Sequence, residues 1–129
     1  MSILKTYLKF QQHMKVNYRI YQLKHNDAGK VRLHRTYDEV KGHIQAQYYE
    51  SVWEEKNFQY EAEENAVSEF EKNGINTIIK KLASDLPEGF YGHVPSVSDI
   101  IVLDDKSAWY VDATGYKELP VELIEELKK

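Results

Sequence analysis

The densest group of potentially reactive side chains lies in the last third of the chain. His93, Ser96, Ser98 and Asp99 bring the residue types of a base, a nucleophile and an orienting acid into seven consecutive positions, and Asp112 follows. Hydrolysis also requires a nucleophile elbow or an oxyanion site, and no Gly-x-Ser-x-Gly motif is present. Short polar side chains beside a strand commonly bond to neighbouring backbone groups. We therefore favour a structural role for Asp99, with a small hydrolase or nuclease using His93, Asp99 and Asp112 as an alternative.

The spacing of histidines and carboxylates does not indicate a metal site. The chain has five histidines and no cysteine, which removes disulfides, Cys-ligated zinc and thiol nucleophiles together. No His-Glu-x-x-His motif occurs. The nearest pattern is Glu39 and His43, four positions apart, and Glu39 is already expected to cap a helix. We therefore expect no bound metal and no cofactor.

Carboxylates are concentrated in one segment near the middle of the chain. Residues 1–49 hold nine Lys or Arg against three Asp or Glu, whereas residues 50–129 hold eight against eighteen. Eight glutamates fall within residues 50–71: Glu50, Glu54, Glu55, Glu61, Glu63, Glu64, Glu69 and Glu71. Carboxylates spread along a strand and a helix can imitate a phosphate backbone and occupy a basic nucleic-acid groove. The alternative is a solvated helix face.

Three short strands are expected to position the reactive group. Residues 100–103 have the brevity and β-branched content of a strand that is buried on both faces. Residues 108–112 alternate, so that Trp109 faces one side of the sheet and Tyr110 the other. Residues 116–119 can return as a third strand after a turn. The pattern predicts a compact β meander.

Upstream of the meander, hydrophobic period and capping signals predict two more strands and a short helix. Residues 16–23 alternate as a half-buried strand, and residues 30–34 are expected to pair with it as a hairpin after a turn at 25–29. Thr36 and Glu39 have the spacing of a capping box that opens a short helix. Residues 48–54 alternate again as a strand.

Further helices complete an α+β fold. A helical stripe from Glu61 is expected to stop at Asn73-Gly74, and residues 75–82 carry the clearest helical stripe, at i, i+3, i+4 and i+7. A last helix is expected after Pro120. We expect a helical addition over residues 1–15 ahead of one α+β domain over residues 16–129. In that domain an antiparallel meander or small mixed sheet packs with three to five helices around a single core.

Size, charge and the lack of long apolar runs limit the classes of protein to which the chain can belong. At 129 residues the chain has the usual size of one domain. No apolar run approaches the roughly 18 residues of a membrane span, and nothing at the N-terminus resembles a signal peptide, so we expect a cytoplasmic protein without membrane contact. The formal net charge is −4, and the basic residues near the N-terminus are scattered. Both features argue against direct nucleic-acid binding.

The last third of the chain resembles the YodL-like domain. Members carry a Gly-His run leading to Ser-Val-Ser-Asp, an aliphatic strand, a Tyr-Tyr-Val-Asp-type strand and a Gly-Tyr-Lys-Glu-Leu-Pro-type ending. The corresponding polar and glycine positions, which we call the signature residues, are Gly92, His93, Ser96, Ser98, Asp99, Asp112 and Gly115. The likeness spans roughly residues 17 to 122. The chain departs from the pattern at Val94-Pro95, in the longer and more acidic segment from Glu54 to Asn73, and in its first fourteen residues.

The resemblance implies an interaction domain more than a reaction. It implies a small domain that is common in Firmicutes and their phages, plasmids and conjugative elements, often beside antirestriction-type domains in large polyvalent proteins, and it brings no catalytic residue. We therefore expect a non-enzymatic module that blocks a host protein. The expected target is a host defence nuclease of restriction or CRISPR type, engaged through the acidic segment. A regulatory or structural domain with another bacterial partner, such as a cytoskeletal or conjugation component, is the alternative.

Overall fold

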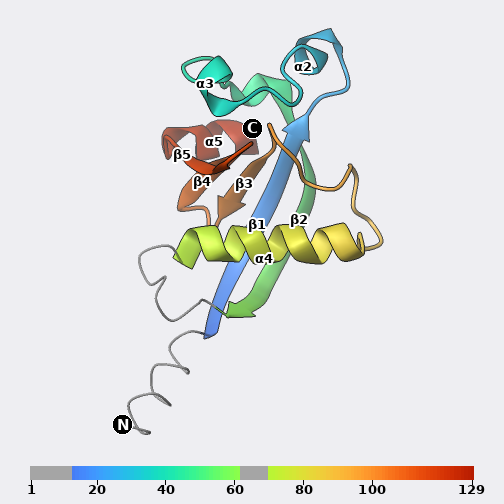
Figure 1. Ribbon diagram of the computed structural model, residues 1–129, viewed down its shortest axis with the longest axis vertical. Helices are drawn as coiled ribbons and strands as arrows, with labels where there is room; N and C mark the ends of the chain where they lie inside the picture. Colours follow the sequence, from blue (N-terminus) through green and yellow to red (C-terminus); the bar gives the residue numbers. More distant parts are fainter. Residues whose placement is uncertain (1–12, 62–69) are drawn as a thin grey trace, which may run out of the picture.

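A five-stranded antiparallel sheet organises the protein (Figure 1). The computed structural model describes residues 13–61 and 70–129. The strands follow the order β2-β1-β3-β4-β5 across the sheet. Their bounds are β1 (His13–Leu23), β2 (Tyr49–Glu61), β3 (Ile100–Leu103), β4 (Ser107–Asp112) and β5 (Gly115–Leu119). The predicted α+β class and the meander of β3, β4 and β5 are confirmed.

Four helices and one 3-10 turn accompany the sheet in the described residues. They are α2 (Asp27–Lys30), α3 (Tyr37–Val40), the 3-10 turn η1 (Ala46–Tyr48), α4 (Phe70–Ser84) and α5 (Glu122–Lys128). Thr36 and Glu39 form the predicted capping box at the start of α3. Among the described helices, none has the length and apolar character of a transmembrane span.

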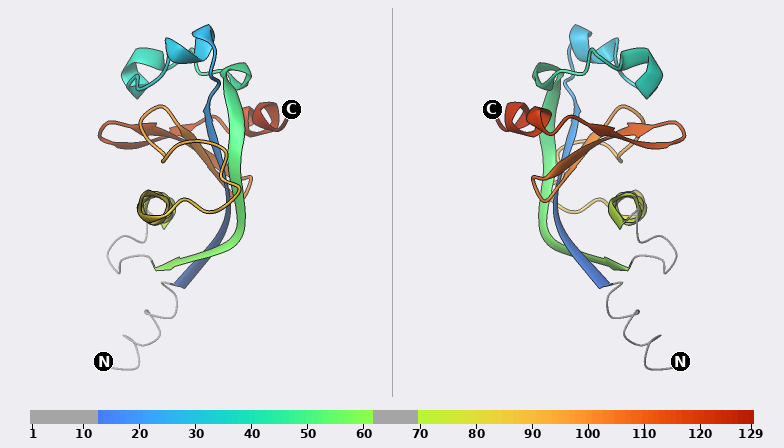
Figure 2. Two further views of the ribbon diagram at one scale, coloured as in Figure 1. Left: turned by 90° about the vertical axis from the view of Figure 1, so that its right-hand side faces the viewer. Right: turned by 90° about the vertical axis from the view of Figure 1, so that its left-hand side faces the viewer.

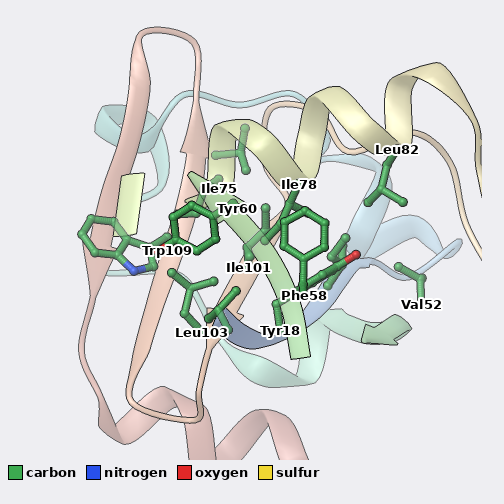
Figure 3. Close-up of a cluster of buried hydrophobic side chains, with 13 residues drawn as sticks. Tyr18, Val52, Phe58, Tyr60, Ile75, Ile78, Leu82, Ile101, Leu103 and Trp109 are labelled. Carbon is green, nitrogen blue, oxygen red and sulfur yellow. The ribbon is translucent and has the colours of Figure 1, made fainter. Parts of the chain in front are cut away.

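The sheet separates two hydrophobic clusters, where the sequence predicted a single core. Figure 2 shows α4 and α5 on opposite sides of β1 and β2. The α4 cluster contains Ile75, Ile78 and Leu82 of the predicted helical stripe, and Figure 3 shows these side chains among the aromatic rings of β1 and β2. The second cluster includes Tyr110 and Ile124. Two clusters form because both faces of the sheet are covered at β3 and β4. The side chains of these strands are therefore buried on both faces.

The predicted hairpin between residues 16–23 and 30–34 is wrong. β1 pairs with β2 and with β3 instead, and Tyr18 faces Glu55 on one side and Leu103 on the other. Asn26 accepts a hydrogen bond from Gly29 N at 2.8 Å, and this bond caps the short helix α2. A turn leading into a strand was expected here. Local capping therefore outweighs the weak alternation of residues 30–34.

Two predicted boundaries also differ. β1 begins at His13, inside the segment expected to be a helical addition, and residues 1–12 lie outside the described residues. Asn73-Gly74 does not stop a helix, because both residues lie inside α4. A Cβ on Gly74 would come within 3.0 Å of Tyr60 Cζ, so this glycine permits close packing of α4 on β2. The helix expected from Glu61 to Asn73 begins on the last residue of β2, continues over residues 62–69, which are not described, and ends on the first residues of α4.

Candidate functional site

Asp99 lies immediately before β3 and is fully buried, with 0% of its surface exposed. Its Oδ2 accepts hydrogen bonds from Gln22 Nε2 at 3.0 Å and from Ser96 N at 2.9 Å. Burial raises the pKa of Asp99 to about 7, while the two hydrogen bonds and the nearby His93 oppose that rise. Since the carboxyl group has no contact with solvent, it serves here as an internal hydrogen-bond acceptor.

Gln22 at the end of β1 joins Asp99 to the loop that precedes it. The Gln22 side-chain amide donates to His93 O at 2.7 Å and accepts from His93 N at 3.1 Å. It thus satisfies both backbone groups of His93, as a neighbouring strand would do in a sheet. A Cβ on Gly92 would lie 2.1 Å from Gln22 Oε1. Glycine is therefore needed at position 92 to leave room for this amide. His93 contributes mainly its backbone to this contact.

Gln22 is one of the site residues that the sequence reasoning missed. It is only 2% exposed and sits on the same side of β1 as Tyr18 and Ile20 by the alternation of a strand. The sequence did contain one indication of this role: a glutamine at a position of the strand where the alternation places buried side chains. A polar side chain there must find buried hydrogen-bond partners.

Three residues at the same end of the sheet bind the backbone of residues 34–37. The three hydrogen bonds are His34 N to Ser98 Oγ at 3.2 Å, Tyr110 Oη to Arg35 O at 2.6 Å, and Tyr37 N to Asp112 Oδ1 at 3.0 Å. Ser98 has a φ of 88°, a left-handed conformation that costs free energy in a non-glycine residue. Tyr49 Oη stabilises that conformation by donating to Ser98 O at 2.7 Å. Ser98 and Asp112 of the signature residues, together with Tyr110, thus connect the sheet to the segment between β1 and β2.

We call this segment, residues 24–48, the cap. Figure 1 shows α2 and α3 at the end of the sheet toward which β1 runs. Gly29 is its only buried residue. Four half-buried side chains of the cap contact the second cluster: Tyr37, Val40, Ile44 and Tyr48. With so little apolar burial, the cap depends for its position on the hydrogen bonds that its backbone makes with Ser98, Tyr110 and Asp112.

Comparison with protein-family models matches residues 17–121 to the YodL-like domain. The chain belongs to the YodL-like domain family. The matched range contains all seven signature residues and nearly coincides with the range over which the sequence resembles the family. No curated protein and no solved structure matches the chain.

Of the three residues of the hydrolase alternative, His93 and Asp99 share Gln22 as a partner in this YodL-like domain, whereas Asp112 has different partners. Asp112 Oδ1 accepts from Tyr37 N and from Ala113 N at 2.9 Å, while Asp99 is enclosed by Gln22 and Ser96. His93 is half-buried, and its Nδ1 lies 2.9 Å from Val94 O. In the described ranges, no group of three or more His, Cys, Asp or Glu side chains is arranged to hold a metal ion.

The glutamates of the acidic segment do not share one face where the structure describes them. Glu54 pairs with Arg19 at 3.0 Å. Its neighbour Glu55 accepts from Tyr18 Oη at 2.7 Å and lies 3.4 Å from Lys81 Nζ, so the two carboxylates point to opposite sides of β2. Glu50 is half-buried at the start of β2. The side chains of Glu61 and Glu71 and all of Glu63, Glu64 and Glu69 lie outside the described residues.

Proposed function

We propose that this YodL-like domain is a non-enzymatic module that acts by binding and blocking another protein. The observation that supports the proposal is the use of its polar signature residues. Asp99 is enclosed, and Ser98 and Asp112 bind the backbone of the cap. Side chains committed in this way stabilise a scaffold, and function then falls to the surface that the scaffold presents.

The proposed setting is a phage or another mobile element, and the proposed target is a host defence nuclease of restriction or CRISPR type. The family resemblance suggests the setting, and the charge distribution suggests the target. A nuclease binds its substrate in a basic groove, where a row of carboxylates competes with phosphates. Because Glu54 and Glu55 already have cationic or hydroxyl partners on opposite faces, the contact is assigned to the five later glutamates: Glu61, Glu63, Glu64, Glu69 and Glu71.

Charge reversal tests this assignment. Replacing those five glutamates by lysine should weaken inhibition of the target nuclease by more than about tenfold, because it replaces attraction to a basic groove with repulsion. The matched control reverses five glutamates that are exposed elsewhere on the surface, Glu88, Glu118, Glu122, Glu125 and Glu126, with the same change in net charge. The measurement is cleavage by a panel of restriction and CRISPR nucleases at increasing inhibitor concentration.

Two outcomes contradict the assignment. Equal inhibition by the reversed variant and the wild-type protein would remove the acidic segment from the contact. Equal losses in the reversed and control variants would show a dependence on net charge alone. If the wild-type protein inhibits no nuclease of the panel, the nuclease target itself is rejected.

The cap favours the second candidate function, a regulatory or structural domain with a partner other than a nuclease. Its five Lys or Arg outnumber its three Asp or Glu, opposite to the balance of the whole chain. A basic surface complements an acidic partner and repels a basic one. Affinity purification from host lysate, followed by identification of the captured protein, separates this function from nuclease inhibition.

A further inference from the structure

Two large apolar side chains, two positions apart in the sequence of the cap, are exposed. Val31 is 61% exposed and Leu33 is 38% exposed, and they are two of the five large hydrophobic side chains exposed in the described residues. A single exposed apolar residue is ordinary in a folded protein. Two of them, on a segment that Ser98 and Asp112 hold in place, make this part of the cap a candidate contact surface.

Two arginines beside these residues are held in defined orientations. Arg32 donates to Ala28 O at 2.7 Å, and its guanidinium lies 3.6 Å from the centre of the Tyr48 ring. Arg35 donates to Val31 O at 3.2 Å and pairs with Glu39 at 3.2 Å. A guanidinium has five N–H donors, so each retains donors for a ligand. Preorganised cations lose less conformational entropy when they bind a carboxylate.

An open cavity joins the apolar and the cationic groups. It has a volume of about 330 Å³ and is lined by Val31, Arg32, Arg35, Glu39, Val40 and His43. Val31 and Val40 supply an apolar wall. The two arginines supply positive charge at its edge, only one of them paired with a carboxylate of the cap. The cavity therefore suits an apolar side chain that is flanked by acidic residues.

We propose that the cap binds an acidic segment of a partner protein. An apolar side chain of that segment enters the cavity against Val31 and Val40, and neighbouring carboxylates bind Arg32 and Arg35. Charge complementarity favours this occupant, since the cap is basic in a protein of net charge −4. A nucleic acid fits less well, because a phosphate backbone gains nothing from the exposed apolar pair and is repelled by the net charge. The inference rests on the proposed protein-binding function, but not on a nuclease as the partner.

A peptide titration followed by nuclear magnetic resonance tests the proposal. The probe is a short synthetic peptide that alternates Glu and Leu, compared with a Glu-Ser peptide and a Lys-Leu peptide of the same length. We expect saturable shifts confined to amides of the cap with the Glu-Leu peptide, weaker binding of the Glu-Ser peptide and none of the Lys-Leu peptide. The protein is used as the full chain.

Two pairs of variants assign the contact. Arg32→Gln with Arg35→Gln should weaken binding of the Glu-Leu peptide by about tenfold, and Val31→Ser with Leu33→Ser by about threefold or more. The matched controls are Lys106→Gln with Lys117→Gln, which removes the same charge from exposed positions, and Val121→Ser, which removes another exposed valine. The controls should bind within about twofold of the wild-type protein. The serine variants alter only exposed side chains, so loss of folding does not complicate them.

Three outcomes would overturn the proposal: shifts outside the cap, equal losses in the cap variants and their controls, or binding of oligothymidylate that is as tight as peptide binding and unaffected by the serine substitutions. The last outcome would identify a general polyanion surface. Failure of the nuclease assay described above, with peptide binding intact, would reject the nuclease target alone. Failure of the peptide titration with inhibition intact would reject the cap contact alone.

Discussion

Replacing Asp99 by alanine is expected to lower the free energy of unfolding by about 3 kcal/mol, because it removes the acceptor of Ser96 N and of one of the two N–H groups of Gln22 and opens a small cavity. The donors are Gln22 Nε2 and Ser96 N, both within 3.0 Å of Asp99 Oδ2. The Asp99→Asn variant should lose less, since an amide oxygen can still accept from both donors. Urea denaturation of the two variants and the wild-type protein at about pH 6 measures the difference.

Because of the same carboxyl group, we expect the free energy of unfolding to depend on pH. The pKa of Asp99 is raised from 3.8 to about 7 in the folded protein, mainly by burial. The folded state therefore binds the proton more tightly than the unfolded state, and the stability gained from it is lost as the pH rises through the folded pKa. Relative to Asp99→Asn, the wild-type protein should lose roughly 3 kcal/mol of stability between about pH 5 and about pH 8.

Parallel stability curves of wild-type and Asp99→Asn proteins across that range would contradict the account of Asp99. The comparison with the amide variant is necessary because other carboxylates titrate in the opposite sense. Glu39, for example, has its pKa lowered by hydrogen bonds from the Thr36 backbone and side chain and from Arg35. Its contribution is present at neutral pH and lost as the pH falls, in wild-type and variant proteins alike.

The second large effect is expected at Gln22. Gln22→Leu keeps the volume of the side chain but removes its hydrogen bonds to His93 N, His93 O and Asp99 Oδ2. We expect a loss of about 3 kcal/mol, since the part-buried N and O of His93 lose their partner and Asp99 Oδ2 keeps only the bond from Ser96 N. The matched control is Gln59→Leu, at an exposed position of β2, with an expected change within about 0.5 kcal/mol.

Thermal and urea unfolding measure both glutamine variants. If Gln22→Leu unfolds at the same denaturant concentration as Gln59→Leu, Gln22 does not join the loop to the sheet in the way the structure indicates. Limited proteolysis adds a local measurement. Cleavage in the loop between α4 and β3 should become faster in Gln22→Leu and stay unchanged in Gln59→Leu.

Features that depend on neighbours in sequence were predictable. The aliphatic run of β3, the alternation of Trp109 and Tyr110 in β4 and the capping box of Thr36 and Glu39 are local patterns, and each appears in the structure as predicted. The partner of β1 was not predictable in this way. It lies across the cap on β2, and no local pattern distinguishes that pairing from a hairpin with residues 30–34.

The candidate site was predictable only in part. Its polar residues were identified, but the partners that give them a role come from distant parts of the chain: Gln22 for Asp99, and the cap backbone for Ser98 and Asp112. Adjacency in sequence is also a poor guide to a shared face within the acidic segment. Glu54 and Glu55 are adjacent in sequence, and the period of a strand places adjacent side chains on opposite faces. Their sequence density therefore overstated their density on one surface.

Hydrogen exchange of the cap is the most direct measurement of the central claim, that the signature residues Ser98 and Asp112 hold the cap in place. The variants are Ser98→Ala and Asp112→Ala, which remove the acceptors of His34 N and Tyr37 N, with Ser84→Ala at an exposed position as the control. We predict about fivefold to tenfold faster exchange of cap amides in the two variants, with amides of β3 and β4 unchanged. Exchange of the cap at the wild-type rate, or equal acceleration throughout the sheet, would contradict the claim.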